Sequence, residues 1–160
     1  TMTYYGKFRG VVVDNNDPNQ LGRLTARVPD IFGDETSGWA LPATPYAGDG
    51  VGLYLMPPVG ASVWVEFEHG EPEYPIWSGC FWASGEVPAS PASPDVKVLK
   101  TMAGTITIND TSGSAGITIE TADGKKIVMD SGGIEITVGQ AVVKLSGPTV
   151  SVNSGALEVT

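Results

Sequence analysis

Cysteine, histidine and basic residues are scarce in this chain, and each shortage excludes a class of protein. The single cysteine, Cys80, cannot build an intrachain disulfide framework, and its apolar neighbours predict a small buried core residue. The single histidine, His69, is predicted to be a solvated turn residue and would be the one candidate base for a Ser-His-Asp triad. Neither a G-x-S-x-G nor a P-loop sequence is present. The sequence therefore predicts no enzyme, no metal site and no cofactor.

Basic residues are outnumbered two to one. Nine lysines and arginines stand against eighteen acidic residues, which gives a formal charge of −9. Affinity for phosphate comes mainly from lysine and arginine, so a nucleic-acid partner is not expected. No run of about 18 apolar residues is present, so we expect no membrane-spanning helix. Residues 1–5 lack the basic region and apolar run of a signal peptide, and we expect none.

Two groups of oxygen-bearing side chains, in residues 14–17 and 66–73, raise the question of a calcium site. Neither group has the spacing and glutamate of an EF-hand loop. Glu66 and Glu68 are expected to share one face of a strand, which indicates a solvated surface. The Asp and Asn residues at 14–17 are typical of a turn that ends a strand.

Helix-forming sequence is also missing, because no ten-residue window has a 3.6-residue apolar period. Twenty-one glycines and twelve prolines punctuate stretches rich in Val, Ile and Thr, so the predicted fold class is all-β. All thirteen aromatic residues lie at or before Trp82, and residues 84–95 form a Pro/Ala/Ser linker. We therefore expect three regions: a barrel at 1–83, a linker and lead-in at 84–103, and a shaft at 104–160.

The first region has strand patterns separated by turn residues. In residues 61–68, Val63, Val65 and Phe67 alternate with residues of the opposite face. Five strands within about 80 residues suit a small barrel of the OB type, and a small sandwich stays open on pattern alone. The strands are expected at residues 5–14, 22–28, 51–55, 61–68 and 74–81.

The shaft region repeats pairs of aliphatic residues with a period of roughly eight, and polar residues occupy the opposite face. Gly139, Gly147 and Gly155 fall eight residues apart and are expected at corners. The predicted core consists of Ile106, Ile108, Ile117, Ile119, Ile127, Met129, Ile134, Ile136, Val143, Leu145, Val150, Val152, Leu157 and Val159.

One copy of such a shaft is predicted to be unstable. Each buried aliphatic residue contributes about 1.5–3 kcal/mol, whereas ordering each residue of the backbone costs about 1–2 kcal/mol. Three copies wound about a common axis would share one dry, narrow interior and pair their open strand edges. A trimeric, intertwined, triple-stranded β-helix is therefore expected, and a monomeric β-solenoid is the alternative.

The sequence resembles a known family at three places: residues 5–27, residues 37–42 (SGWALP), and residues 57–82 (PPVGASVWVEFEHGEPEYPIWSGCFW). It is similar there to the OB domain of V-type phage baseplate assembly proteins and of VgrG-like spikes. Those spikes belong to type VI secretion and to extracellular contractile injection particles. The matching motif consists of Pro57, Gly60, Val63, Val65, Phe67, Gly70, Pro75, Gly79 and Trp82.

The resemblance implies a central spike that punctures a target envelope mechanically after contraction of a sheath. In this family a trimeric β-helix follows the OB domain. The expected setting is the tip of a phage tail baseplate or injection particle, after assembly in the bacterial cytoplasm. A separate hub protein would bind the OB end, and a PAAR-like protein would cap the C-terminal end. The lysozyme domain and the His-x-His iron motif of some relatives are missing, which agrees with a structural role.

Two other functions remain open from the sequence. OB barrels bind oligosaccharides in some proteins, and Tyr4, Trp39, Tyr46 and Tyr54 could form a platform for sugar rings. The chain would then be a trimeric glycan-binding adhesin or a fibre-like protein. A β-helical polysaccharide lyase or hydrolase would need acidic residues clustered on one shaft face, and the shaft acids are scattered.

Overall fold

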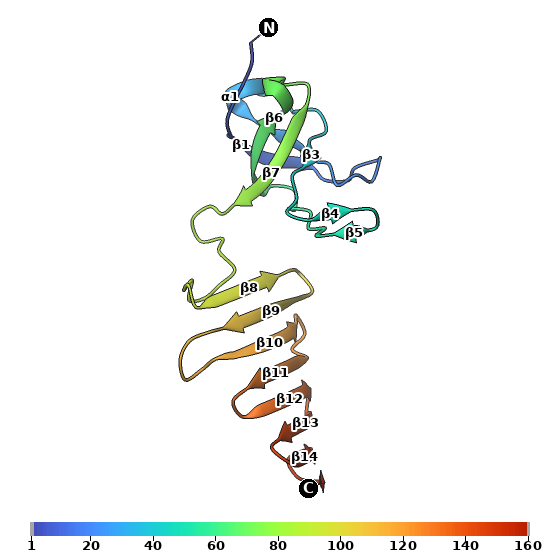
Figure 1. Cartoon of the computed structure of the whole chain (residues 1–160), viewed down its shortest axis with the longest axis vertical. Helices are drawn as coiled ribbons and strands as arrows, with labels where there is room; N and C mark the ends of the chain where they lie inside the picture. The colour runs from blue at the N-terminus through green and yellow to red at the C-terminus, as the bar shows by residue number, and fades with distance from the viewer. Residues whose placement is uncertain (1, 160) are drawn as a thin grey trace. The chain divides into compact units, whose positions relative to one another are not determined.

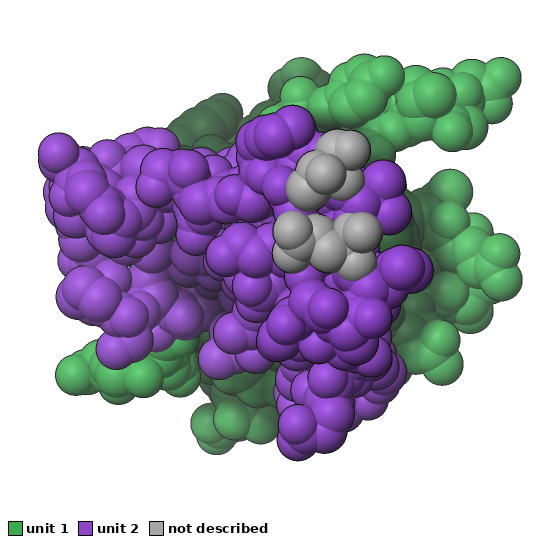
Figure 2. All heavy atoms as spheres, turned by 90° about the horizontal axis from the view of Figure 1, so that it is seen from below, with its two compact units in different colours: residues 1–86 green, residues 87–160 purple. Residues whose placement is uncertain are grey.

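The computed structural model describes residues 2–159, apart from the side chain of Glu158, so Thr1 and Thr160 lie outside the described residues. The chain divides into two compact units, residues 1–86 and 87–160 (Figures 1 and 2). Both consist of strands, and the described helical segments are limited to α1 (Pro29–Phe32) and the 3-10 turn η1 (Glu68–Gly70). The all-β prediction is confirmed. No helix within residues 2–159 is long and apolar enough to cross a membrane.

The first unit is built on a five-stranded sheet with the order β2-β1-β6-β7-β3. Neighbouring strands are antiparallel except β3 and β7, which are parallel. Bridges from Leu24 to Ala40 and from Arg27 to Thr36 join the β2 segment to the chain ahead of β3. The sheet therefore closes on itself, consistent with an OB domain. The strands are β1 (Phe8–Asp14), β2 (Thr25–Arg27), β3 (Leu41–Pro42), β6 (Ser62–Phe67) and β7 (Pro75–Phe81).

The barrel encloses the buried core of the chain. Strand β6 follows the predicted alternation, because Val63, Val65 and Phe67 are buried while the residues between them are half-buried. The ring of Phe67 packs against those of Tyr4, Phe8 and Phe32, with centroids 5.7–6.4 Å apart. The core members are Val12, Leu24, Ala26, Val28, Ala40, Val63, Val65, Phe67 and Trp77.

One predicted barrel strand, at residues 51–55, is wrong. Only Val51–Gly52 (β5) is extended there, and it pairs with β4 (Ala47–Gly48) in a separate two-stranded hairpin. A Cβ atom at Gly52 would lie 2.8 Å from the carbonyl oxygen of Tyr46, so only glycine permits this tight local pairing. The fifth place in the barrel sheet belongs instead to β3, a strand of two residues that was not predicted.

The prediction for Cys80 is also wrong, because this residue is exposed. Between the pairs Trp64–Gly79 and Val65–Trp77 the register of β6 and β7 shifts by one residue, which is a β-bulge. A bulge bends its strand, and the end of β7 lies beyond the enclosed core. The turn predicted at His69 is confirmed, since His69 lies in η1 with a φ of 51°.

The second unit is one antiparallel sheet in which every strand pairs with its neighbours in sequence, as the colour order of Figure 1 shows. Strand β8 lies within the predicted lead-in, so the sheet begins before residue 104. The strands are β8 (Val96–Lys100), β9 (Gly104–Asn109), β10 (Gly116–Thr121), β11 (Lys126–Asp130), β12 (Gly133–Val138), β13 (Ala141–Ser146), β14 (Thr149–Val152) and β15 (Leu157–Val159).

Candidate assembly surface

The strand register brings all fourteen predicted shaft residues onto one face of the second sheet. Ile119, for example, lies opposite Ile106 on one side and Ile127 on the other. We call this set the aliphatic ladder. It has two columns, Ile106-Ile119-Ile127-Ile136-Val143-Val152-Leu157 and Ile108-Ile117-Met129-Ile134-Leu145-Val150-Val159.

Within the described residues of the second unit, nothing covers the ladder. Ile117 is 37% exposed and Leu157 is 61% exposed, and every buried hydrophobic residue in the part of the chain that the structure describes belongs to the first unit. A sheet with one bare aliphatic face exposes surface worth about 1.5–3 kcal/mol for each large side chain. This face is therefore the strongest candidate for a surface that becomes buried on assembly.

Leu99 extends the ladder by one residue that the sequence pattern did not reveal. It lies opposite Ile106 and is 47% exposed. In the other column Lys97 takes the corresponding place opposite Ile108, and its ammonium group pairs with Asp110. The ladder therefore ends at β8 with one aliphatic and one charged side chain. The alternation in residues 96–100 gave no signal for Leu99, because it groups the apolar Val96 and Val98, which lie on the opposite face.

The opposite face of the sheet is mainly polar. Lys144 lies opposite Glu135, with 4.0 Å between the ammonium nitrogen and the carboxylate oxygen, and Lys126 lies 3.7 Å from Glu120. Such exposed pairs contribute at most about 1 kcal/mol each. These ion pairs indicate that this face of the sheet remains in contact with water. Val96, Val98, Val128 and Val142 are the aliphatic exceptions on this face.

The predicted corner glycines lie at corners. Gly139 and Gly147 begin two-residue turns with φ values of 58° and 57°, and Gly155 has a φ of 95° between β14 and β15. Residues with a side chain rarely adopt these angles. The corners let each strand return directly beside the last one, which keeps the two columns in register.

The family-motif residues of the barrel divide into three kinds. Gly60 and Gly79 have φ values of 88° and 142°, so they serve turns and the bulge. Trp82 is 63% exposed at the end of the barrel unit. The six buried members are Pro57, Val63, Val65, Phe67, Gly70 and Pro75.

The predicted strand-ending turn at residues 14–17 contains a charge cluster that sequence reasoning missed. The carboxylate of Asp17 accepts hydrogen bonds from the guanidinium of Arg23, at 2.7 Å from Nη2, and from the backbone N–H groups of Asn19 and Leu21. The Arg23 guanidinium also lies 5.6 Å from the ring centre of Trp39. The Arg23 hydrogen bonds hold the pKa of Asp17 well below its usual range. This contact closes the loop between β1 and β2.

We expect the Asp17→Asn variant to lower the thermal midpoint of barrel unfolding by several degrees at pH 7. The amide cannot neutralise Arg23, whose side chain is only 17% exposed. In the unfolded chain the carboxyl group of Asp17 has an ordinary pKa of about 4. Because the pKa is lower in the folded protein, the ionised carboxylate stabilises the fold fully above about pH 4, and this stabilisation is lost as the pH falls from there towards the pKa of the folded protein. The difference in thermal midpoint between wild type and the Asp17→Asn variant should therefore become smaller below about pH 4.

The matched control is Asp49→Asn, which removes an exposed carboxylate from the hairpin. Thermal unfolding of the three proteins, followed by tryptophan fluorescence from pH 7 to pH 3, measures both effects. Equal midpoints for wild type and Asp17→Asn at pH 7 would contradict a stabilising role for this contact.

The acidic residues that raised the question of calcium do not gather into a site. Within residues 2–159, no three His, Cys, Asp or Glu side chains are placed to hold a metal ion. Glu66 instead pairs with Lys7, with 3.0 Å between the charged groups, and this contact lowers the pKa of Glu66. The arrangement stabilises the outer surface of β6.

Comparisons with known proteins assign a description to each unit. The type VI secretion system/phage-baseplate injector OB domain matches residues 8–82. The phage baseplate V C-terminal trimerisation domain matches residues 96–158, which supports a homotrimer. The type VI secretion system spike protein VgrG4b of Pseudomonas aeruginosa strain PAO1 is 38% identical to this chain over 71 residues. That alignment covers 43% of this chain but only 9% of the relative.

Proposed function

This chain belongs to the family of phage baseplate V proteins and VgrG-like injector spikes, and from that premise we propose that it is a trimeric central spike. The family is one of structural spike and baseplate components, and membership implies a location at a tail baseplate. The observation that carries the proposal is the bare aliphatic ladder, because a spike shaft needs an interior that one chain does not enclose.

In the proposed shaft, three ladders face a common axis and form a continuous aliphatic column. The ladder contains only Ile, Val, Leu and Met, so the column can be narrow along its whole length. The polar faces, with pairs such as Glu135 and Lys144, remain in water. Wound together in this way, the three sheets would form the triple-stranded β-helix.

A shaft of this kind would act mechanically. Its backbone hydrogen bonds run between successive strands along its entire length, and its interior would be dry, so the assembly should resist unfolding under load. We propose that a separate hub protein binds the barrels and that a PAAR-like protein caps the last strands. Sheath contraction would then drive the tip into the target envelope with no chemical step on this chain.

The proposal predicts where the chain lies in an assembled particle. Contractile particles are purified from the producing bacterium, and the chain is labelled with gold through a tag on its N-terminus. We expect gold at the baseplate end of each particle. Particles with gold along the tail or on the fibres, or with none, would contradict a central spike. Label on the fibres would favour the adhesin instead.

A further inference from the structure

Among the described residues, Lys97 is the one charged side chain in the two columns of the ladder face. It lies opposite Ile108, and the other places in both columns, from Leu99 onward, hold Ile, Val, Leu or Met. Its ammonium group pairs with the carboxylate of Asp110, which directly follows β9, and each side chain is 55% exposed. The ladder is therefore aliphatic along its length and carries an ion pair at its β8 end.

The repeat of the ladder leaves the alignment of three chains weakly specified by apolar contacts. Neighbouring strands lie about 4.8 Å apart, and each presents two aliphatic side chains to the same face. A chain displaced by two strands keeps its strand direction and again places aliphatic pairs against aliphatic pairs. Ile108 of one copy would then share a layer with Met129 of another. The apolar pattern alone therefore permits more than one alignment.

The connection to the barrel does not prevent such a displacement. Residues 82–95 join β7 to β8. A displacement by two strands moves a chain by about 10 Å, whereas a connection of this length can reach about 45 Å when it is extended. The alignment of the shaft strands therefore has to be determined within the shaft.

The charged end of the ladder distinguishes one alignment from the others. With all strands level, the three pairs of Lys97 and Asp110 lie together in the end layer, where water still reaches them. After a displacement by two strands, Lys97 of at least one copy would face Ile117 of another and lose its water. The desolvation of an ion pair can exceed the attraction between its charges, so the displaced alignment is disfavoured. A single polar residue in an aliphatic seam specifies register in coiled coils in the same way.

We propose that Lys97 determines the register of the three chains in the shaft, with Asp110 as its counter-ion. The inference rests on the proposed function, because it requires the trimer. Lys97 would contribute to the choice of one alignment and not to the strength of association, since leucine at this place would extend the aliphatic column. A single register also brings the three copies of β15 to the same level, which gives a tip protein one even surface.

Methyl NMR spectroscopy of the full chain tests the register. A trimer with level strands has threefold symmetry, so the three copies of each isoleucine give one δ1-methyl cross-peak. A displaced chain makes the copies inequivalent and adds cross-peaks. We expect one set from wild type and additional cross-peaks for ladder residues such as Ile108 and Ile117 from Lys97→Leu. Both proteins should keep a native mass of three chains of 16.7 kDa.

Two control variants separate register from a general effect of the substitution. Lys100→Leu makes the same change on the opposite face of β8, where Lys100 lies opposite Thr105, and should keep one set of cross-peaks. Lys97→Arg keeps the charge beside Asp110 and should also keep one set. Additional cross-peaks from either control would contradict the assignment to the charge of Lys97.

The failure of this inference differs from the failure of the spike. A trimeric Lys97→Leu variant with one set of cross-peaks would overturn the register role and leave the spike intact. Loss of the trimer in Lys97→Leu would also overturn it, because the pair would then hold the chains together instead of aligning them. A monomeric native mass for wild type would overturn both proposals.

Discussion

The Ile119→Asp variant is expected to lose the trimer completely. Ile119 lies in the middle of the aliphatic ladder, opposite Ile106 and Ile127. In three packed ladders the substitution would bring three carboxylates into one dry layer. The desolvation of each buried charge would cost several kcal/mol. The lost aliphatic packing adds about 2–5 kcal/mol per chain. Together these costs exceed the net stability of a typical fold, about 5–15 kcal/mol.

The control for this variant is Thr118→Asp, which introduces an aspartate one residue earlier in β10. Thr118 lies on the opposite face, across from Thr107 and Val128, where a carboxylate can stay hydrated. Light scattering of both variants should give a monomeric or aggregated Ile119→Asp and a trimeric Thr118→Asp. A trimer from both variants would mean that the ladder is not the buried face.

The Gly133→Ala variant is expected to destabilise the shaft by about 3 kcal/mol or more per chain. Gly133 begins β12 with a φ of 120°, an angle that residues with a side chain rarely adopt. An added Cβ atom would lie 1.9 Å from the carbonyl oxygen of Leu145, so β12 and β13 would have to separate. Thermal unfolding followed by circular dichroism should show a midpoint lower by more than about 10 °C.

The neighbouring Gly132→Ala variant is the matched control. Its added Cβ atom would lie 3.1 Å from a carboxylate oxygen of Asp130, at the end of a side chain that can rotate away. Its midpoint should stay within a few degrees of wild type. Equal midpoints for Gly132→Ala and Gly133→Ala would show that the β11–β12 corner is looser than the structure indicates.

The sequence predicts the ladder well because its signal is local and periodic. In β10, Ile117 and Ile119 flank Thr118, and the same alternation in the neighbouring strands places the aliphatic residues on one face. The corner glycines fix where each strand turns, which leaves one register for the next strand. The pattern does not show which surface packs against the ladder, because alternation within a strand only assigns each residue to one face or the other.

The missed features depend on contacts between distant residues. Strand β3 has only two residues, and its place is set by Leu41 and Pro42 lying beside Ile76 and Trp77 of β7. The apolar residues at 51–55 suggested a strand, but Gly52 lets the segment fold back on residues 46–47. Cys80 looked like a core residue because the bulge in β7 has no signature in the residues around it.

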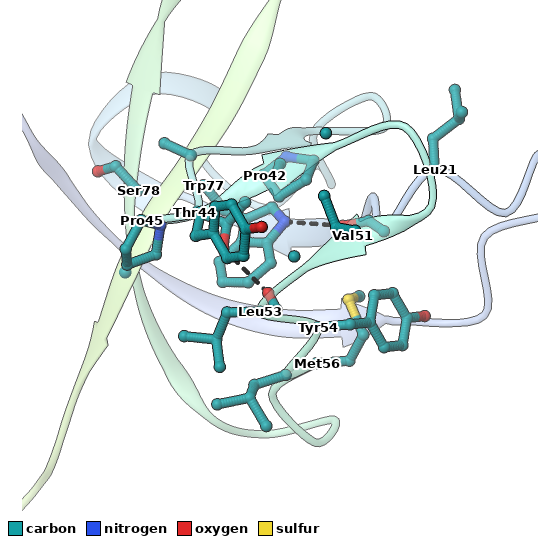
Figure 3. A pocket seen from close by; sticks show the side chains of 18 of the residues that line it. Leu21, Pro42, Thr44, Pro45, Val51, Leu53, Tyr54, Met56, Trp77 and Ser78 are labelled. Atoms are coloured by element: carbon teal, nitrogen blue, oxygen red, sulfur yellow. Dashed lines mark hydrogen bonds between the residues drawn. The ribbon is translucent and has the colours of Figure 1, made fainter.

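The candidate surfaces also differ in whether a local sequence pattern or contacts between distant residues define them. The aliphatic ladder could be named residue by residue from its period. The apolar groove beside β4 and β5 (Figure 3) could not, because Tyr46, Leu53 and Tyr54 line it together only after the β4–β5 hairpin has folded. The buried contact between Asp17 and Arg23 also required the loop to close, although both residues stood in the motif region.

The native mass of the intact chain decides whether the ladder is an interior or a surface. One chain has a mass of 16.7 kDa, so three wound together should appear as a single species of about 50 kDa in native mass spectrometry. A folded, soluble species of 16.7 kDa, with β-sheet circular dichroism and the ladder still accessible to solvent, would contradict the trimeric spike.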